Sequence, residues 1–326
     1  MNSKERQILI IGGSGFVGGH LVPTLQQAGF SITLLNRGHR LIDGTRQLVA
    51  DRNDRGEMLA CADVASEYDA IIDTSAYTVE QAALAVECFG RRTAHWLHLG
   101  SAAVYLDVLA IPPVEDGAIG GAPIWGSYGA EKSAIDNFLR HNEIGLNITV
   151  LRPPYLYGPG NDNDRESFVW SRVLRSEPIL VPGDGATKVQ FLHVADLANA
   201  FLACIRRPKL GFTIYNVAGP DIVSLHEWVE IAATCANRAF RIENVKQFSG
   251  RYSPREYFPF RDFPCWVDAS QIERDLNWRP MFSLGVGLAA AFKTYNPQEL
   301  IEQSQQSPAE IAILRTLNTL NLNKNV

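Results

Sequence analysis

The sequence has few cysteines, and their arrangement argues against several kinds of site. There are five in 326 residues: Cys61, Cys88, Cys204, Cys235 and Cys265. They are odd in number, lie far apart and form no Cys-x-x-Cys pair, so neither a disulfide scaffold nor a cysteine zinc site is expected. The pattern predicts reduced, mostly buried thiols in a cytoplasmic protein, and no metal site.

The sequence also lacks a long apolar segment and an excess of positive charge. No apolar run reaches the roughly 18 residues that a membrane span needs, and residues 1–6 lead straight into a predicted strand without a signal-peptide core. With 30 Lys and Arg against 35 Asp and Glu, the net charge is −5. Such a chain has no overall positive field to attract nucleic acid or an anionic membrane. We therefore expect neither as a partner.

What the chain does contain is ample apolar material in a regular order. Hydrophobic residues make up 46% of the sequence and charged residues 20%. Short apolar runs alternate with amphipathic segments, which is typical of a parallel sheet covered by helices on both faces. Strands are expected at 7–11, 31–35, 47–50, 69–73, 96–100, 147–151 and 213–217, and helices at 78–89, 128–143 and 194–205.

This order predicts an α/β protein: a Rossmann-type, doubly wound parallel sheet with a smaller C-terminal substrate lobe. Residues 1–152 are predicted to form the NAD(P)-binding Rossmann domain, to which elements near 190–218 return. Turn residues become frequent after Arg152, so residues 153–300 are expected to be mostly a substrate-binding lobe. The polar residues 301–326 are expected to form a tail or a final helix.

A glycine-rich segment follows the first predicted strand and opens the first predicted helix. Gly12, Gly15 and Gly18 are spaced G-x-x-G-x-x-G, with Phe16 and Val17 at the start of the helix. Glycines at such a turn let the backbone approach a pyrophosphate, and the helix N-terminus favours the phosphate charge. The segment predicts a dinucleotide site, and a tight turn without a ligand is the alternative.

The end of the second predicted strand indicates which dinucleotide binds. Sites for NAD usually place Asp or Glu there, whereas this chain has Asn36 followed by Arg37. A guanidinium pairs well with a 2′-phosphate, so NADP is favoured over NAD. The alternative is that Arg37 is simply a solvated loop residue. Asp51 is expected to contact the adenine edge or to cap the following turn, and the strand end Thr74-Ser75-Ala76 is expected to run beneath the cofactor.

Tyr128 and Lys132 form a Tyr-x-x-x-Lys pair, which on a helix places both side chains on one face. A nearby ammonium stabilises phenolate, so the tyrosine is able to exchange a proton with a substrate hydroxyl or carbonyl group. Ser101, after the fifth predicted strand, is expected to hydrogen-bond the same substrate oxygen. A surface tyrosine and lysine on an amphipathic helix is the alternative.

Taken together, these motifs resemble the extended short-chain dehydrogenases/reductases of the NAD-dependent epimerase/dehydratase type. The similarity covers most of residues 7–295 and includes the segments 152–160, 191–197 and 276–280. The resemblance implies that Tyr128 is the acid/base, that Lys132 also holds the nicotinamide ribose, and that Ser101 orients the substrate. It also implies a cofactor contact at Pro153 and a homodimer built on the helix that carries Tyr128.

Three shorter segments resemble one branch of that family. Residues 36–38, 101–106 and 258–262 are similar to the chloroplast stem-loop-binding proteins and their bacterial relatives. Those chloroplast proteins are associated with RNA binding, and their Tyr-x-x-x-Lys pair is altered. Here the pair is intact, which favours redox chemistry over RNA binding.

One departure from the family bears on the substrate. Sugar-nucleotide epimerases commonly carry an arginine that grips phosphate four residues before the His-Val pair at 193–194, and here that position is Val189, preceded by Lys188. A nucleotide sugar is therefore less favoured. The stretch 252–266, rich in aromatic residues and arginine, is expected either to line the substrate cleft or to pack as an irregular lobe. The candidate substrate contacts are Ala103, Trp125, Tyr155, Lys188 and Arg261.

The sequence therefore predicts an NADP-dependent oxidoreductase or epimerase. Its substrate is expected to be a secondary alcohol or ketone of a small polar molecule, with sugar-like molecules among the candidates. An RNA-binding protein that retains the fold is one alternative. An NAD(P)-retaining dehydratase is the other, although the Ser101-Ala102-Ala103 segment lacks the acidic residue that dehydration usually needs.

Overall fold

The computed structural model describes residues 6–141, 144–303 and 305–324. The chain divides into two compact units. Unit 1 comprises Met1–Leu156, Phe191–Gly219 and Cys265–Met281, and unit 2 comprises Tyr157–Gln190, Pro220–Pro264 and Phe282–Val326.

Unit 1 is built on a seven-stranded sheet in the order β10-β6-β5-β4-β1-β2-β3, with every pair of neighbours parallel. The order reverses between β1 and β4, which is the switch point at which doubly wound sheets bind ligands beyond the carboxyl ends of their strands. The strands are β1 (Arg6–Ile11), β2 (Phe30–Asn36), β3 (Thr45–Val49), β4 (Ala70–Asp73), β5 (His95–Leu99), β6 (Asn147–Arg152) and β10 (Phe212–Asn216).

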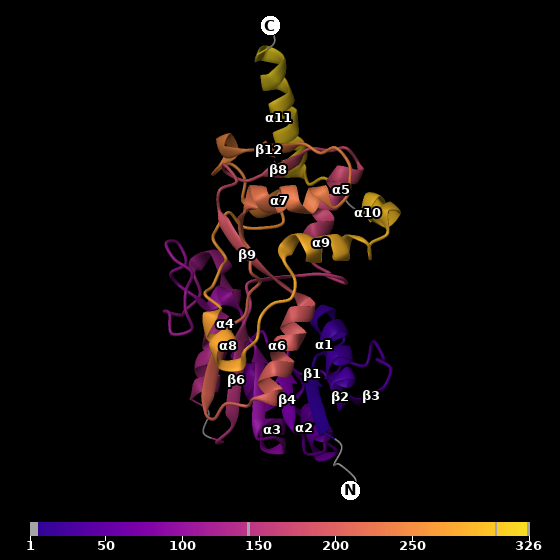
Figure 1. Ribbon diagram of the computed structural model, residues 1–326, viewed down its shortest axis with the longest axis vertical. Coiled ribbons are helices and arrows are strands. Elements are labelled where there is room, and N and C mark those ends of the chain that lie inside the picture. The colour runs from indigo at the N-terminus through magenta and orange to yellow at the C-terminus, as the bar shows by residue number, and fades with distance from the viewer. Residues whose placement is uncertain (1–5, 142–143, 304, 325–326) are drawn as a thin grey trace. The chain divides into compact units, whose positions relative to one another are not determined.

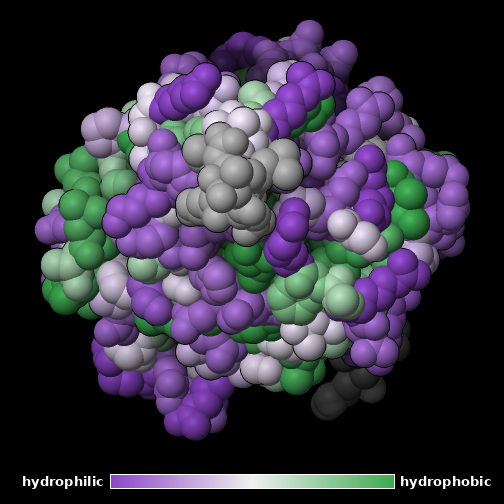
Figure 2. Space-filling view, turned by 90° about the horizontal axis from the view of Figure 1, so that it is seen from above, coloured by the Kyte–Doolittle hydropathy of each residue, from purple (hydrophilic) through white to green (hydrophobic). Residues whose placement is uncertain are grey.

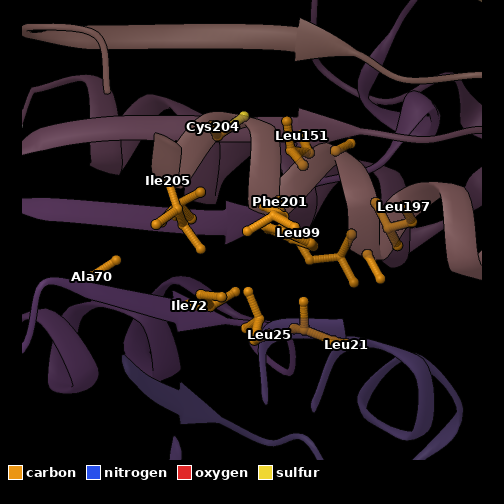
Figure 3. Packing of buried hydrophobic residues seen from close by; sticks show 14 of the residues in the cluster. Leu21, Leu25, Ala70, Ile72, Leu99, Leu151, Leu197, Phe201, Cys204 and Ile205 are labelled. Atoms are coloured by element: carbon orange, nitrogen blue, oxygen red, sulfur yellow. The ribbon is translucent and has the colours of Figure 1, made fainter. Parts of the chain in front are cut away.

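Helices cover both faces of this sheet and enclose two apolar layers. In Figure 1, α1 and α6 lie side by side over one face, and Figure 3 shows their side chains against those of β4, β5 and β6. The opposite layer draws on α2, α3 and α4. The helices are α1 (Phe16–Gln27), α2 (Arg55–Asp63), α3 (Val79–Phe89), α4 (Ser127–Arg140), α6 (Val194–Arg206) and α8 (Ser270–Leu276). The prediction of a Rossmann-type α/β fold is confirmed.

The predicted element boundaries differ from the observed ones by a few residues, for local reasons. The helix expected from residue 78 begins one residue later because Thr78 caps it, its hydroxyl accepting from the Gln81 N–H at 3.4 Å. The helix expected over 128–143 is α4, which begins at Ser127 and ends at Arg140. Residues 142–143 lie outside the described part of the chain.

Unit 2 packs around an aromatic cluster. Trp228 of α7 meets Phe260 edge to face at 4.7 Å between ring centroids, and Phe258 packs against Phe168 of α5 at 5.9 Å. Phe258 and Phe260 are buried, so this part of the 252–266 stretch is packed lobe rather than cleft wall. The helices are α5 (Glu166–Leu174), α7 (Leu225–Thr234), α9 (Leu284–Phe292), α10 (Pro297–Gln303) and α11 (Pro308–Lys324).

Further short strands and the C-terminal segment complete the fold. β8 (Ile179–Val181) pairs in parallel with β12 (Ile242–Asn244), and β11 (Ile222–Ser224) pairs antiparallel with the first half of β9 (Lys188–His193); β7 covers Tyr155–Tyr157. The final helix expected within residues 301–326 is α11, and a buried ion pair of 2.9 Å between Glu310 and Arg172 connects it to α5. Of the described residues between 301 and 324, all but 305–307 are helical.

The surface shown in Figure 2 is dominated by hydrophilic residues, with hydrophobic ones in separate small patches. Within the described residues, no helix combines the length and the apolar character that crossing a membrane requires. All five cysteines are free thiols, and Cys61, Cys204 and Cys265 are buried, as the sequence predicts for most of them.

Candidate active site

The glycine segment leaves β1 and enters α1 along a path that requires glycine at Gly12 and Gly18. Gly12 has a φ of +103°, and a Cβ atom there would lie 2.6 Å from the Thr74 hydroxyl. A Cβ on Gly18 would lie 2.0 Å from the carbonyl oxygen of Gly13. A Cβ on Gly15, by contrast, would meet no described atom within 4 Å, so the start of α1 faces open space.

The remaining residues of this segment are placed as the motif requires. Phe16 is the first residue of α1, where its ring meets that of His20 edge to face, and Val17 packs against the apolar layer beneath α1. The sequence predicted both as cofactor contacts. Their backbone lies at the helix start, and the prediction of contact stays a prediction.

The end of β2 places a polar group and a cation at the carboxyl edge of the sheet. The Asn36 side-chain oxygen accepts from the Gly38 N–H at 2.8 Å, while its Nδ2 is buried with no hydrogen-bond partner among the described residues. Arg37 is exposed, and its charge helps to lower the pKa of Asp51. The larger cause of that shift is the hydrogen bonds from Asn53. Asp51 thus caps the turn that follows β3, which is one of its two predicted roles.

Thr74 and Ser75 close the floor of the glycine segment. Both hydroxyls donate to the carbonyl of Ile11 at the end of β1, at 3.1 and 3.3 Å. Behind them, Asp73 is fully buried and forms a two-point ion pair with Arg52 at 2.9 Å, and Arg52 also donates to the Ser75 hydroxyl. Burial alone would raise the pKa of Asp73, but the Arg52 charge and hydrogen bonds lower it to about 2.

Lys132 of α4 is buried between the ends of β4 and β5. Its Nζ donates to the carbonyls of Ala76, at 2.7 Å, and of Leu99, at 3.0 Å. Burial lowers the pKa of Lys132 to about 8, although the charges of Asp73 and Asp136 act in the opposite direction. Tyr128 lies one turn earlier on α4 and is partly exposed.

Ser101 and Pro153 flank the carboxyl ends of β5 and β6. The Ser101 Oγ accepts from the Ala103 N–H at 3.2 Å, which fixes its position, and the Pro153 carbonyl accepts from the Ala102 N–H at 2.9 Å. The buried Ala103 approaches α4 so closely that a Cβ on Gly129 would lie 2.7 Å from its carbonyl oxygen. The structure therefore brings Ser101 and the Tyr128 helix to the same edge of one sheet.

The five candidate substrate contacts separate into two groups. Ala103, Trp125 and Tyr155 belong to unit 1, where the two aromatic rings meet edge to face at 6.2 Å. Lys188 and Arg261 belong to unit 2. The Lys188 ammonium is 3.3 Å from the carboxylate of Glu227, so its charge already has a counter-ion.

Several groups around the site carry no recognisable sequence signal. Arg52 and Asp73 are 21 residues apart, and the ring of Tyr77 lies against Lys132 and Tyr128. His98 of β5 pairs in register with Asp73 and is fully buried, so burial lowers its pKa to about 3 and it is neutral at working pH. Of these four residues, only Asp73 lies at the end of a predicted strand. Among the described residues, no group of three or more His, Cys, Asp or Glu side chains is placed to hold a metal.

Comparison with known proteins agrees with this geometry. The model of the NAD dependent epimerase/dehydratase family matches residues 8–218. The chain belongs to this family. It is accordingly an enzyme of the extended short-chain dehydrogenase/reductase type, as the motifs at Gly12, Tyr128 and Lys132 predict.

Individual relatives differ in what they do. The chain is 28% identical over 311 residues to the chloroplast stem-loop binding protein of 41 kDa b from Arabidopsis thaliana, covering 89% of this chain and 79% of that protein. It is 25% identical over 277 residues to dTDP-4-dehydro-6-deoxy-D-allose reductase from Streptomyces bikiniensis, covering 73% and 83%. In fold it is similar to UDP-glucose 4-epimerase from Thermus thermophilus, solved in complex with NAD, with a TM-score of 0.71 at 17% identity, covering 88% of this chain and 98% of that one.

The site residues fit a nicotinamide dinucleotide. The open space before Gly15 lies at a helix N-terminus, where pyrophosphate binds well, and the buried Asn36 Nδ2 is a donor without a partner among the described side chains and backbone. Asn36 and Arg37 stand where the adenosine ribose is held in such folds.

Proposed function

We propose that this protein is an NADP-dependent oxidoreductase or epimerase that acts on a secondary alcohol or ketone of a small polar molecule. The observation that supports this most directly is the setting of Lys132, a buried ammonium held by two backbone carbonyls one helical turn from Tyr128. A bound nicotinamide supplies or accepts hydride at the substrate carbon. We further propose a cytoplasmic homodimer.

In this mechanism Tyr128 moves the proton of the reacting oxygen. A protonated Lys132 favours the phenolate form, so Tyr128 accepts a proton from an alcohol or, in the reverse direction, returns it to a carbonyl oxygen. The Ser101 Oγ already accepts from the Ala103 N–H, which leaves its hydroxyl hydrogen to donate to that oxygen. Lys132 also holds the nicotinamide ribose.

The proposal for the substrate rests on β9. Val189 is fully buried, and the neighbouring Lys188 is engaged by Glu227. Neither side chain offers the two-point hydrogen bonding by which arginine holds a phosphate. A small polar molecule, with sugar-like ones included, therefore fits this position better than a nucleotide sugar.

The preference for NADP is tested by titrating the purified protein with NADPH and NADH side by side. Arg37 is exposed at the end of β2, and no acidic residue occupies the neighbouring position 36. We expect tighter binding of NADPH, and a loss of about tenfold or more in NADPH affinity on Arg37→Ala, because a charged hydrogen bond contributes roughly 1.5–3 kcal/mol. NADH affinity should not change.

Arg91→Ala is the matched control, since it removes another exposed arginine just before β5, at the opposite edge of the sheet. If both nucleotides bound equally well, or Arg91→Ala had the same effect as Arg37→Ala, the NADP assignment would be wrong. Binding of neither nucleotide would overturn the redox proposal itself.

The role of Tyr128 is tested with Tyr128→Phe, using a substrate found by screening carbonyl compounds with NADPH. Loss of the acid/base should lower turnover by a factor of about 100 or more. NADPH affinity should stay within a few-fold of the unmodified protein, because the phenyl ring remains in place. Retained turnover would contradict the mechanism.

A second candidate function is binding of structured RNA, favoured by the 28% identity over 89% of the chain to the chloroplast stem-loop binding protein. The net charge of −5 and the intact Tyr128–Lys132 pair speak against it. Binding to a stem-loop RNA that weakens steeply with salt would support it, and no mobility shift at low salt would dispose of it.

A further inference from the structure

The loop that follows β4 encloses the ammonium of Lys132 from two directions. The carbonyl of Ala76 accepts from Nζ at 2.7 Å, and the next residue, Tyr77, places its ring centroid 5.5 Å from the same nitrogen. The Tyr77 ring also lies 6.4 Å from that of Tyr128, at an angle of 48°. Tyr77 thus contacts both members of the Tyr-x-x-x-Lys pair.

The loop holds this tyrosine in a defined place. The backbone N–H of Tyr77 donates to the side-chain oxygen of Gln81 at 2.8 Å, and Thr78 caps α3 immediately afterwards. The Gln81 side chain is in turn anchored, donating to Asn53 at 2.8 Å. Tyr77 is nevertheless 60% exposed, so apolar packing does not account for the position of its ring.

We propose that Tyr77 is a positioning residue of the active site, whose ring face stabilises the protonated form of Lys132. The protonated Lys132 in turn favours the phenolate form of Tyr128, so Tyr128 exchanges its proton more easily. This inference rests on the proposed function of the Tyr128–Lys132 pair. It adds a third side chain to that pair, from the loop between β4 and α3.

The physical reason lies in what surrounds the ammonium. An ammonium has three N–H donors, and two of those of Lys132 donate to neutral backbone carbonyls. A cation within about 6 Å of an aromatic ring centroid is attracted by the negative ring face. The attraction of the ammonium to the Tyr77 ring face therefore offsets part of the free-energy cost of burying the Lys132 charge.

The other charged groups around Lys132 act on it from fixed positions. Asp73 of β4 and Asp136 of α4 favour its protonated form, whereas burial and the charge of Arg52 oppose it. His98 of β5 is buried and neutral. Tyr77 and Tyr128 complete the set of titratable groups described around this ammonium, and only these two are substantially exposed.

The experiment compares two substitutions that both remove the Tyr77 hydroxyl. Tyr77→Phe keeps the ring face and Tyr77→Leu removes it. Each is made with and without Tyr128→Phe, and the absorbance of tyrosinate at about 295 nm is followed against pH. The difference within each pair reports the ionisation of Tyr128 alone. Without the ring face, Lys132 loses its proton at lower pH, so Tyr128 should ionise about half a pH unit higher in the leucine variant than in the phenylalanine variant.

The same data separate the two proposals. Equal midpoints for Tyr128 in the two variants, or a lower one in the leucine variant, would overturn the role of Tyr77 while leaving the proposed function standing. A Tyr128 midpoint at or above about 10 in the unmodified protein would instead contradict the Tyr128–Lys132 pair, and the role of Tyr77 with it. If Tyr77→Leu failed to fold, Tyr77→Gln would replace it, since it also lacks the ring.

Discussion

Helix α4 carries one buried cation, Lys132, and the partner of another, Arg152, and the two positive charges are stabilised in different ways. Arg152 of β6 donates to the Asp136 carboxylate of α4 at 2.8 Å, and its other arm donates to the Tyr105 hydroxyl at 2.9 Å. The Tyr105 hydroxyl in turn donates to the side-chain oxygen of Asn216 at 2.7 Å. Arg152 and Asp136 are both essentially inaccessible to solvent. This cation is therefore matched by a full negative charge.

Lys132 stands one turn before Asp136 on α4, yet its ammonium is held by two backbone carbonyls and the face of Tyr77. None of the described carboxylates lies at ion-pair distance from it. Burial accordingly lowers its pKa to about 8, close to the pH at which enzymes work.

The difference shows how one helix carries both a structural and a chemical cation. A guanidinium paired with a carboxylate keeps its charge at every relevant pH, so Arg152 is suited to fixing β6 against α4. An ammonium surrounded by neutral dipoles responds to small changes nearby, so Lys132 is suited to proton chemistry beside Tyr128. The neighbouring Arg52–Asp73 pair follows the first pattern.

The largest expected effect comes from removing the carboxylate of the structural pair. Asp136→Ala leaves the Arg152 guanidinium buried without its counter-charge, and breaking such a pair typically costs about 3–5 kcal/mol in the free energy of unfolding. Urea unfolding followed by circular dichroism measures this loss.

Glu87→Ala serves as the control, because it breaks the exposed ion pair with Arg55 on the surface of the same unit. We expect no resolvable change there, since exposed pairs contribute little. If the Asp136 variant were as stable as the Glu87 variant, Arg152 would not depend on its carboxylate.

The sequence predicts well those parts of the site that a single segment carries. The glycine spacing at Gly12, Gly15 and Gly18 and the i, i+4 pair of Tyr128 and Lys132 are local patterns, and the structure places each on the expected strand end or helix. The parallel sheet is equally readable, because buried strands such as β1 are continuous apolar runs.

The remaining groups cannot be read from the sequence, because their partners come from distant segments. Tyr105 and Asn216 are 111 residues apart, and the strand end at Asp73 meets Arg52 from the loop after β3. Tyr77 follows a strand end without any recognisable pattern. Only the order of the strands in the sheet brings these side chains together, and that order is a property of the whole fold.

A smaller effect tests the second cation through the pH dependence of stability. In the unfolded chain a lysine keeps its proton to about pH 10.5, whereas folded Lys132 releases it above about pH 8. Between these values the unfolded state binds more protons, so this lysine makes the free energy of unfolding rise with pH. Relative to Lys132→Met, the unmodified protein should gain up to about 3 kcal/mol across this range.

Lys188→Met is the matched control, since it removes a partly exposed lysine whose ammonium pairs with Glu227. The difference in unfolding free energy between this variant and the unmodified protein should not rise from pH 8 to pH 10.5, because the Lys188 side chain is not buried. If the Lys132→Met difference also stayed constant, the buried ammonium would be keeping its proton as firmly as Arg152 keeps its charge. The contrast between Arg152 as a structural cation and Lys132 as a titratable one would then fail. Two carbonyls and a ring face would be stabilising the Lys132 ammonium as well as a carboxylate stabilises the Arg152 guanidinium.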